Sequence, residues 1–175
     1  DFPEDPDLAY NSHYPAEGQN GTIVAEDLWP GFGDFDFNDL VLEYHFQSMS
    51  DANNKVKKMA IDITIMAIGA SFRNGFGIEL PVSTSAIKSV NGLNPEFDFV
   101  KLSSNGTESG QSNAVLVFFE DAYKVLPFVG NGSGVNTDMT EPKSDPVTIS
   151  AEIEFVQSLS RAELGSEPYN PFIII

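Results

Sequence analysis

The chain has 175 residues and a formal net charge of −17, from 26 acidic and 9 basic residues. Nine basic residues are too few to neutralise a nucleic-acid backbone or an anionic membrane surface, which argues against both as partners. The chain has no cysteine, which excludes disulfides, thiolate metal sites and cysteine catalysis.

A chain of this length predicts a single domain spanning residues 1–175. It contains no run of about 18 apolar residues, so we expect no membrane-spanning helix. Residues 1–5 are not a basic-then-apolar leader, so the protein is either cytosolic or exported with a signal segment outside this sequence. The sequence ends on the apolar residues 172–175, and we expect a C-terminally truncated fragment of a longer chain.

Strand patterns dominate from residue 22 onward, whereas residues 1–21 are rich in Pro, Asp, Asn and Gly and predict extended or looping chain. Residues 40–46 and 147–155 alternate between apolar and polar side chains, which is the pattern of a half-buried strand. Further strands are predicted at residues 22–25, 56–70, 75–81 and 113–120, with a helical turn or a strand within 83–93.

No apolar repeat of helical period extends over ten or more residues. Seven or more short strands joined by loops rich in Gly, Asn, Ser and Asp predict an all-β fold. The expected architecture is a two-sheet antiparallel β-sandwich, jelly-roll or immunoglobulin-like, with few or no helices.

The acidic stretch, residues 26–39, holds the densest group of oxygen ligands in the chain, and acidic or amide side chains recur at every second position from residue 34 to residue 38. Calcium takes about six to eight oxygens from carboxylates, amides and carbonyls on a chain that curls around the ion. The sequence therefore predicts a Ca²⁺ site. Its expected ligands are Asp34, Asp36, Asn38 and Asp39, with Asp27 or Glu26 completing the shell.

The acidic stretch does not form an EF-hand loop, because Asp39 stands where the turn glycine belongs and His45 where the bidentate glutamate belongs. Mg²⁺ suits the stretch less well than Ca²⁺, since it keeps its waters and tolerates little geometric slack. The alternative is an acidic turn whose Asp and Asn side chains cap backbone amides without any ion. Both interpretations stay open at the level of sequence.

Other chemistry has weaker support. His13 and His45 are the only histidines, and we expect surface imidazoles rather than a zinc site. A carboxylate pair for glycoside hydrolysis is possible in any chain with 26 acidic residues and has no specificity here. One group of aromatics either forms a sugar-stacking platform or plugs the core beneath the acidic stretch: Trp29, Phe32, Phe35 and Phe37.

Three blocks of the sequence resemble the LruC-type domain, found in secreted or outer-envelope proteins of Bacteroidetes and other bacteria. The blocks are Ala25–Val41 (with Glu-Asp-Leu-Trp-Pro and Gly-Asp-Phe-Asp-Phe-Asn-Asp), Gly69–Gly77 and Asn105–Gln111, and Tyr169–Ile173 is similar to a later one. The resemblance implies an envelope-associated β-sandwich, joined to other modules, with a role in adhesion or at a surface. It implies no known reaction and no ligand set.

The leading hypothesis is a non-catalytic extracellular or cell-envelope module, secreted or held at the cell surface or outer membrane. Its Ca²⁺-binding loop would support adhesion to a glycan, a host or cell-surface component, or a neighbouring domain. One alternative is a carbohydrate-active enzyme with a carboxylate pair, which predicts a cleft with carboxyl groups about 5–10 Å apart. Another is a structural module without metal.

Overall fold

The computed structural model describes residues 6–28, 31, 33, 36–96, 99–130 and 134–175. Within these ranges the strands are β1 (Tyr10–Tyr14), β2 (Gly21–Ala25), β3 (Leu40–Ser50), β4 (Val56–Ala67), β5 (Gly75–Ser83), β6 (Ile87–Asn91), β7 (Asn113–Phe119), β8 (Val147–Leu159) and β9 (Asn170–Ile174). The helical elements are the single turns α1 (Ala122–Val125) and α2 (Arg161–Leu164) and two 3₁₀ turns, η1 (Pro6–Leu8) and η2 (Thr84–Ala86). None of the helices found in these ranges is long and apolar enough to cross a membrane.

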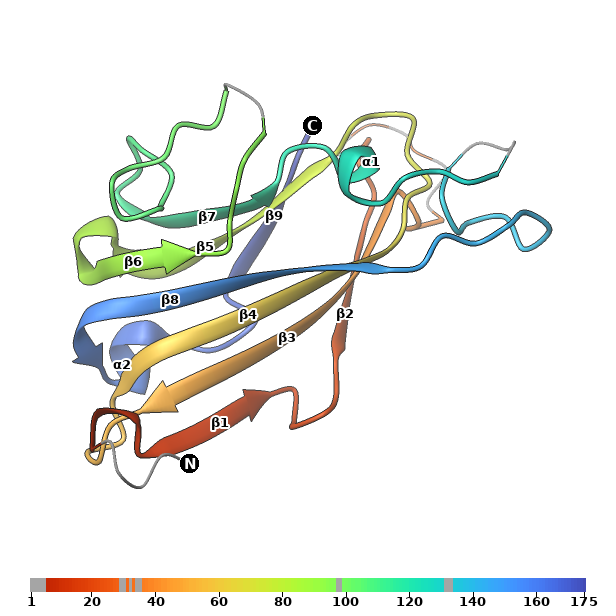
Figure 1. Cartoon of the computed structure of the whole chain (residues 1–175). Coiled ribbons are helices and arrows are strands. Elements are labelled where there is room, and N and C mark those ends of the chain that lie inside the picture. The colour runs from red at the N-terminus through yellow and green to blue at the C-terminus, as the bar shows by residue number, and fades with distance from the viewer. Residues whose placement is uncertain (1–5, 29–30, 32, 34–35, 97–98, 131–133) are drawn as a thin grey trace.

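The strands form two antiparallel sheets (Figure 1). The wide sheet has six strands in the order β1-β3-β4-β8-β6, with β2 also paired to β3, and the narrow sheet has the order β7-β5-β9. This arrangement confirms the predicted all-β fold with two antiparallel sheets and few helices.

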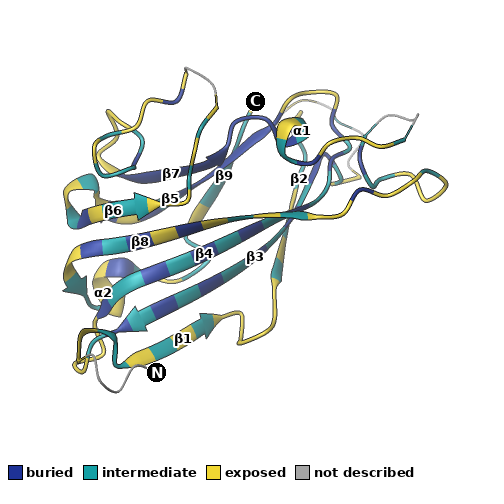
Figure 2. Cartoon of the chain, in the orientation of Figure 1, coloured by how far each residue is buried: buried dark blue, intermediate teal, exposed yellow. Residues whose placement is uncertain are grey.

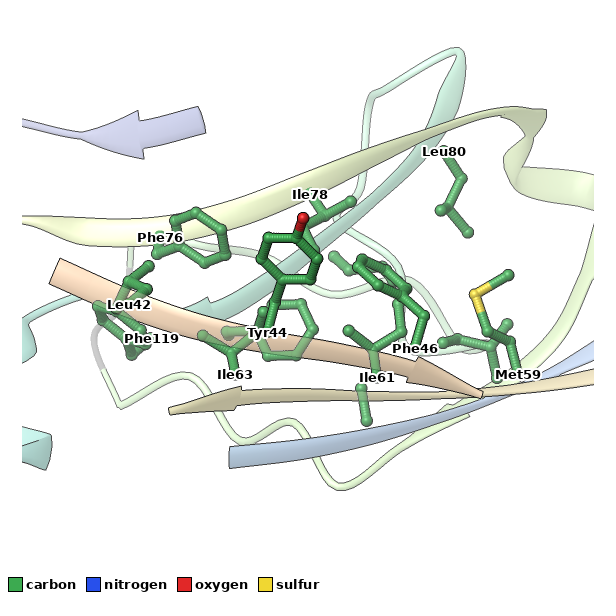
Figure 3. Packing of buried hydrophobic residues seen from close by; sticks show 14 of the residues in the cluster. Leu42, Tyr44, Phe46, Met59, Ile61, Ile63, Phe76, Ile78, Leu80 and Phe119 are labelled. Atoms are coloured by element: carbon green, nitrogen blue, oxygen red, sulfur yellow. The ribbon is translucent and has the colours of Figure 1, made fainter. Parts of the chain in front are cut away.

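The core lies between the two sheets and follows from the period-two pattern of the sequence. Along β3 buried and half-buried residues alternate without a break (Figure 2), because successive side chains of a strand point to opposite faces. The buried side chains of β3 and β4 face those of β5 across the core (Figure 3). The labelled members of this set are Leu42, Tyr44 and Phe46 of β3, Met59, Ile61 and Ile63 of β4, and Phe76, Ile78 and Leu80 of β5.

The predicted strands are confirmed with small shifts of their ends, and residues 83–93 contain both a helical turn and a strand. The sequence failed to predict β1. Asn11, Ser12 and His13 give this strand no apolar alternation, and the strand needs little, because it lies at the edge of the wide sheet with every residue exposed or half-buried.

β1 and β2 lie end to end along the same edge of β3. β1 pairs with residues 46–50 of β3, and β2 pairs with residues 40–44. Residues 15–20 leave the sheet between them, at the level of His45. The edge of the wide sheet is therefore one long strand interrupted by a six-residue excursion, defined here as residues 15–20.

The narrow sheet is covered on both faces. Its inner face packs on the wide sheet, and on its outer face Val100 packs with Val115 and Val117 of β7 and with Phe172 and Ile174 of β9. Val100 comes from the segment that precedes β7, and in the same segment the N–H of Glu108 donates to the carbonyl of Val115 at 2.9 Å. Almost all of β7 is buried as a result.

Candidate metal centre

The acidic stretch connects β2 to β3, and the pairing of these strands fixes where its two ends lie. Ala25 is paired with Leu40, so the antiparallel register brings the residues just after β2 next to the residue just before β3. Glu26, Asp27 and Asp39 therefore meet at the mouth of the loop. One carboxylate oxygen from each lies within 4.8 Å of the other two.

This acidic trio, Glu26, Asp27 and Asp39, lies mostly out of contact with solvent. The exposed fraction is 6% for Asp27 and 9% for Asp39. The backbone N–H of Asp27 donates to Oδ2 of Asp39 at 2.8 Å, which holds the two segments together. Two carboxylates at this separation repel each other by about 3.5 kcal/mol at an effective dielectric constant of about 20. A positive charge among them would remove that repulsion.

Asn74, which immediately precedes β5, reaches the trio from the narrow sheet. Its side chain is fully buried, and its Nδ2 donates to Oδ2 of Asp27 at 3.0 Å. Its Oδ1 is also buried, and accepts no hydrogen bond from any residue that the structure describes. A buried acceptor in this state costs about 1–3 kcal/mol. A half-turn of the amide about its last torsion directs this oxygen at Asp27, where a shared cation would satisfy both groups.

The backbone around Asp39 is held by the residues that follow β4. The N–H of Gly69 donates to the carbonyl of Asn38 at 2.9 Å, and the N–H of Ala70 donates to that of Asp39 at 3.3 Å. Gly69 leaves no room for a side chain, because a Cβ there would lie 1.8 Å from Oδ1 of Asn38. Residues 38 and 39 are thus fixed against the body of the sandwich before any ion binds.

The surroundings of the trio are acidic. Asp121 caps α1 by accepting from the N–H of Tyr123 at 3.0 Å, and its other oxygen binds Nη1 of Arg73 at 2.6 Å. The hydroxyl of Tyr123 donates to the carbonyl of Ala70 at 2.7 Å. Burial raises the pKa of Tyr123, and the negative charges of Asp121 and Asp39 raise it further. Arg73 is paired with Asp121, and the carboxylates of Asp39 and Asp121 both lie near the ring of Tyr123.

The six predicted ligands do not all meet. The trio consists of Asp39 and the two residues expected to assist it. Asp36 is exposed and lies outside the trio, and its carboxylate accepts from both the backbone N–H and the side chain of Asn38. This pair has the form of the Asx cap that the sequence left open. Asp34 lies outside the described residues.

Of the aromatic group, Trp29, Phe32 and Phe35 also lie outside the described residues, and Phe37 is half exposed rather than a core plug. Asn74 was missed by sequence reasoning, since it is 47 residues from Asp27 and meets it only because the two sheets pack. Its place at the entry to β5 gives no local signal of this contact.

A known protein family matches most of the chain. The model of a domain of unknown function, DUF4842, matches residues 54–175, which is well over half of the chain. The chain belongs to the DUF4842 family. Neither the curated proteins nor the solved structures contain a match. The DUF4842 region runs from the start of β4 to β9, so it includes Asn74 and Gly69, whereas the acidic trio precedes it.

A second group of carboxylates lines a cleft of about 310 Å³ between α1 and the segment after β6. Glu120 and Asp121 are both buried on its wall, beside Phe118. Asp121 is engaged by Arg73 and by the cap of α1, and Oε1 of Glu120 accepts from the N–H of Val100 at 3.4 Å. Through these contacts both carboxylates hold neighbouring segments of the cleft wall in place.

Proposed function

We propose that this DUF4842 protein is a non-catalytic β-sandwich module, secreted or held at the cell surface or outer membrane, whose acidic trio binds Ca²⁺. The observation that carries the calcium proposal is the meeting of three carboxylates with the buried amide of Asn74, whose Oδ1 accepts no hydrogen bond from the described residues. One hard cation would bring a positive charge to the three carboxylates and a partner to this amide oxygen.

The chemistry of the donors favours calcium over other metals. All the donors at the trio are oxygens, which suit Ca²⁺ and Mg²⁺ rather than zinc or copper. Calcium accepts irregular shells of carboxylate, amide and water oxygens, whereas magnesium requires a near-ideal octahedron. The proposed ligands are Glu26, Asp27, Asp39 and Oδ1 of Asn74. Asp34, Asp36 and Asn38 of the same loop are further candidate donors.

The proposed ion would join elements that are far apart in the sequence. Asp27 follows β2 and Asp39 precedes β3 in the wide sheet, whereas Asn74 precedes β5 in the narrow sheet. An ion shared by these residues links the two sheets at one corner of the sandwich. Because it binds only the folded state, it would stabilise that state by about 2.7 kcal/mol at a hundredfold excess over its dissociation constant.

The adhesion role rests on the resemblance to the LruC-type domain and on the charge of the chain. A net charge of −17 leaves glycans, protein surfaces and neighbouring domains as the suitable partners, rather than nucleic acid. A loop made rigid by an ion offers such partners a surface with little ordering cost. The proposed role is therefore calcium-dependent attachment to a glycan, a host or cell-surface component, or an adjacent domain.

The metal is tested by calorimetric titration with CaCl₂ and MgCl₂ and by melting curves in calcium and in EGTA. We expect one calcium equivalent, weaker magnesium binding, and a melting temperature that rises with calcium. A melting temperature that is the same in both buffers, together with no heat of binding, rules out the ion. Attachment is tested on a glycan array in calcium and in EGTA. Glycan binding of equal strength in both buffers would show that adhesion does not depend on the metal.

The second candidate, a carbohydrate-active enzyme, is favoured only by the cleft that Glu120 and Asp121 line. It predicts turnover of glycosides that disappears in Glu120→Gln. Hydrolysis that is absent from the parent, or unchanged in the variant, ends that candidate.

A further inference from the structure

The two histidines of the chain meet at the edge of the wide sheet. Nδ1 of His13, near the end of β1, lies 3.0 Å from Nε2 of His45 on β3. Nδ1 of His45 lies 2.8 Å from the backbone carbonyl oxygen of Gln19, within the excursion. Both side chains are half-buried.

The register of the strands explains why these rings meet. His13 is paired with Gln47, and His45 lies two residues before Gln47 in β3, on the same face. Diagonal neighbours of this kind are about 7–8 Å apart at Cα, which is within reach of two imidazoles. Because the chain leaves the sheet at residues 15–20, no edge residue pairs with His45, and its ring turns toward His13 and Gln19.

The carbonyl of Gln19 fixes the proton on His45. A carbonyl oxygen only accepts, so Nδ1 of His45 carries the proton, and in the neutral ring Nε2 keeps its lone pair. In the metal-free protein that lone pair accepts a hydrogen bond from the Nδ1–H of His13 at 3.0 Å. A histidine that ligates a metal through one nitrogen commonly donates from the other to a backbone carbonyl, which fixes the tautomer and the orientation of the ring. His45 has this arrangement already.

We infer that His13 and His45 form a two-imidazole site for a divalent transition-metal ion, separate from the acidic trio. With metal–nitrogen bonds of about 2.0–2.1 Å, two neighbouring ligands at a right angle are about 2.9 Å apart, and two tetrahedral ligands about 3.3 Å apart. The observed 3.0 Å matches the right-angled arrangement of Ni²⁺ and Cu²⁺. Binding requires His13 to carry its proton on Nε2, so that Nδ1 faces the ion.

The neighbouring side chains favour a cation. Asp62 of β4 is paired directly with His45, and Glu43 shares the outer face of β3 with it. Oε2 of Glu43 accepts from Nδ2 of Asn20, the last residue of the excursion. An ion held by the two rings would tie β1 and the excursion to β3, with water in its remaining coordination positions.

The test is calorimetric titration of the tag-free chain with NiCl₂, in buffer that contains calcium so that the acidic trio is occupied. We expect one nickel equivalent in the parent. His13→Gln and His45→Gln should each lower the affinity by about tenfold or more, equivalent to about 1.4 kcal/mol. Glu152→Gln, which removes an exposed carboxylate from the outer face of β8, is the matched control and should leave the affinity unchanged.

The parent also gives a test that needs no substitution. With two histidines in the chain, an imidazole-selective nitrogen–proton spectrum contains two ring systems, and substoichiometric Ni²⁺ should broaden both together. Broadening of a single ring, of neither ring, or an affinity that either histidine variant retains would overturn the site. Because the titration contains calcium, failure here leaves the calcium proposal untouched, and failure of the calcium proposal leaves this one untouched.

Discussion

Replacing Asp39 by asparagine should change stability in opposite directions with and without calcium. The substitution keeps an oxygen that can accept the Asp27 N–H and removes one negative charge from the acidic trio. If the carboxylates lie together in order to hold an ion, the neutral amide relieves repulsion when the ion is absent and weakens the site when it is present.

The magnitude follows from the geometry. At 4.8 Å and an effective dielectric constant of about 20, each carboxylate pair that includes Asp39 costs about 3.5 kcal/mol. The hydrogen bond from the N–H of Asp27 then has a neutral acceptor, which lowers the stabilisation by about 1–2 kcal/mol. Relief of one such pair less this loss leaves about 1.5–2.5 kcal/mol, and the second pair adds to it, so we expect Asp39→Asn to raise the free energy of unfolding by at least about 1.5 kcal/mol in EGTA. In calcium the parent gains about 2.7 kcal/mol at a hundredfold excess over its dissociation constant, and the variant loses most of that gain.

The assay is urea unfolding of parent and variant in EGTA and in calcium, monitored by circular dichroism. Glu152→Gln removes one carboxylate from an exposed strand position and should shift neither curve by more than about 0.5 kcal/mol. A variant that is destabilised equally in both buffers would show that Asp39 only anchors the Asp27 N–H, and would refute the repulsion argument.

Three further outcomes follow from the structure. Phe46→Ala empties a core position that is 1% exposed and should cost about 3–5 kcal/mol by urea unfolding, and a cost below about 1 kcal/mol would contradict the packing described. Gly69→Ala forces a Cβ against Oδ1 of Asn38 and should lower both the melting temperature and the calcium affinity; an unchanged affinity would detach Gly69 from the site. The backbone N–H of Lys55 and then that of Asn53 lower the pKa of Asp51, so its stabilisation is complete above its unfolded-state pKa of about 3.9 and is lost as the pH falls through the lowered value. The gap in unfolding free energy between parent and Asp51→Asn should therefore narrow from pH 7 to pH 3, and a gap that is constant across the titration would contradict that sign.

The fold was predictable where one strand face is buried and the other is not. The alternation of β3 and β8 has a period of two that no helix shares, so both strands were found from sequence. β1 has no such pattern, since its pairing comes from the open edge of β3 and not from its own side chains. α1 and α2 are single turns, too short to leave a helical period.

The candidate site divides in the same way. Glu26 and Asp39 flank the ends of two strands that pair, so a hairpin register is enough to bring them together. Asn74 meets Asp27 only when the two sheets pack, and no local pattern encodes that contact. The regular spacing of Asp36 and Asn38 predicted these residues as leading ligands, yet the two hydrogen-bond each other and Asp36 is not part of the trio.

The apolar cluster on the outer face of the narrow sheet limits where recognition can occur. Val100, Val115 and Val117 are buried together there, so these side chains offer no apolar surface to a partner on that side of the domain. The accessible flank is the outside of β4 and β8, where Lys58 pairs in register with Glu154 and Thr64 hydrogen-bonds Thr148. A glycan or protein that binds this flank would contact hydroxyl and charged groups, and its affinity should fall as ionic strength rises.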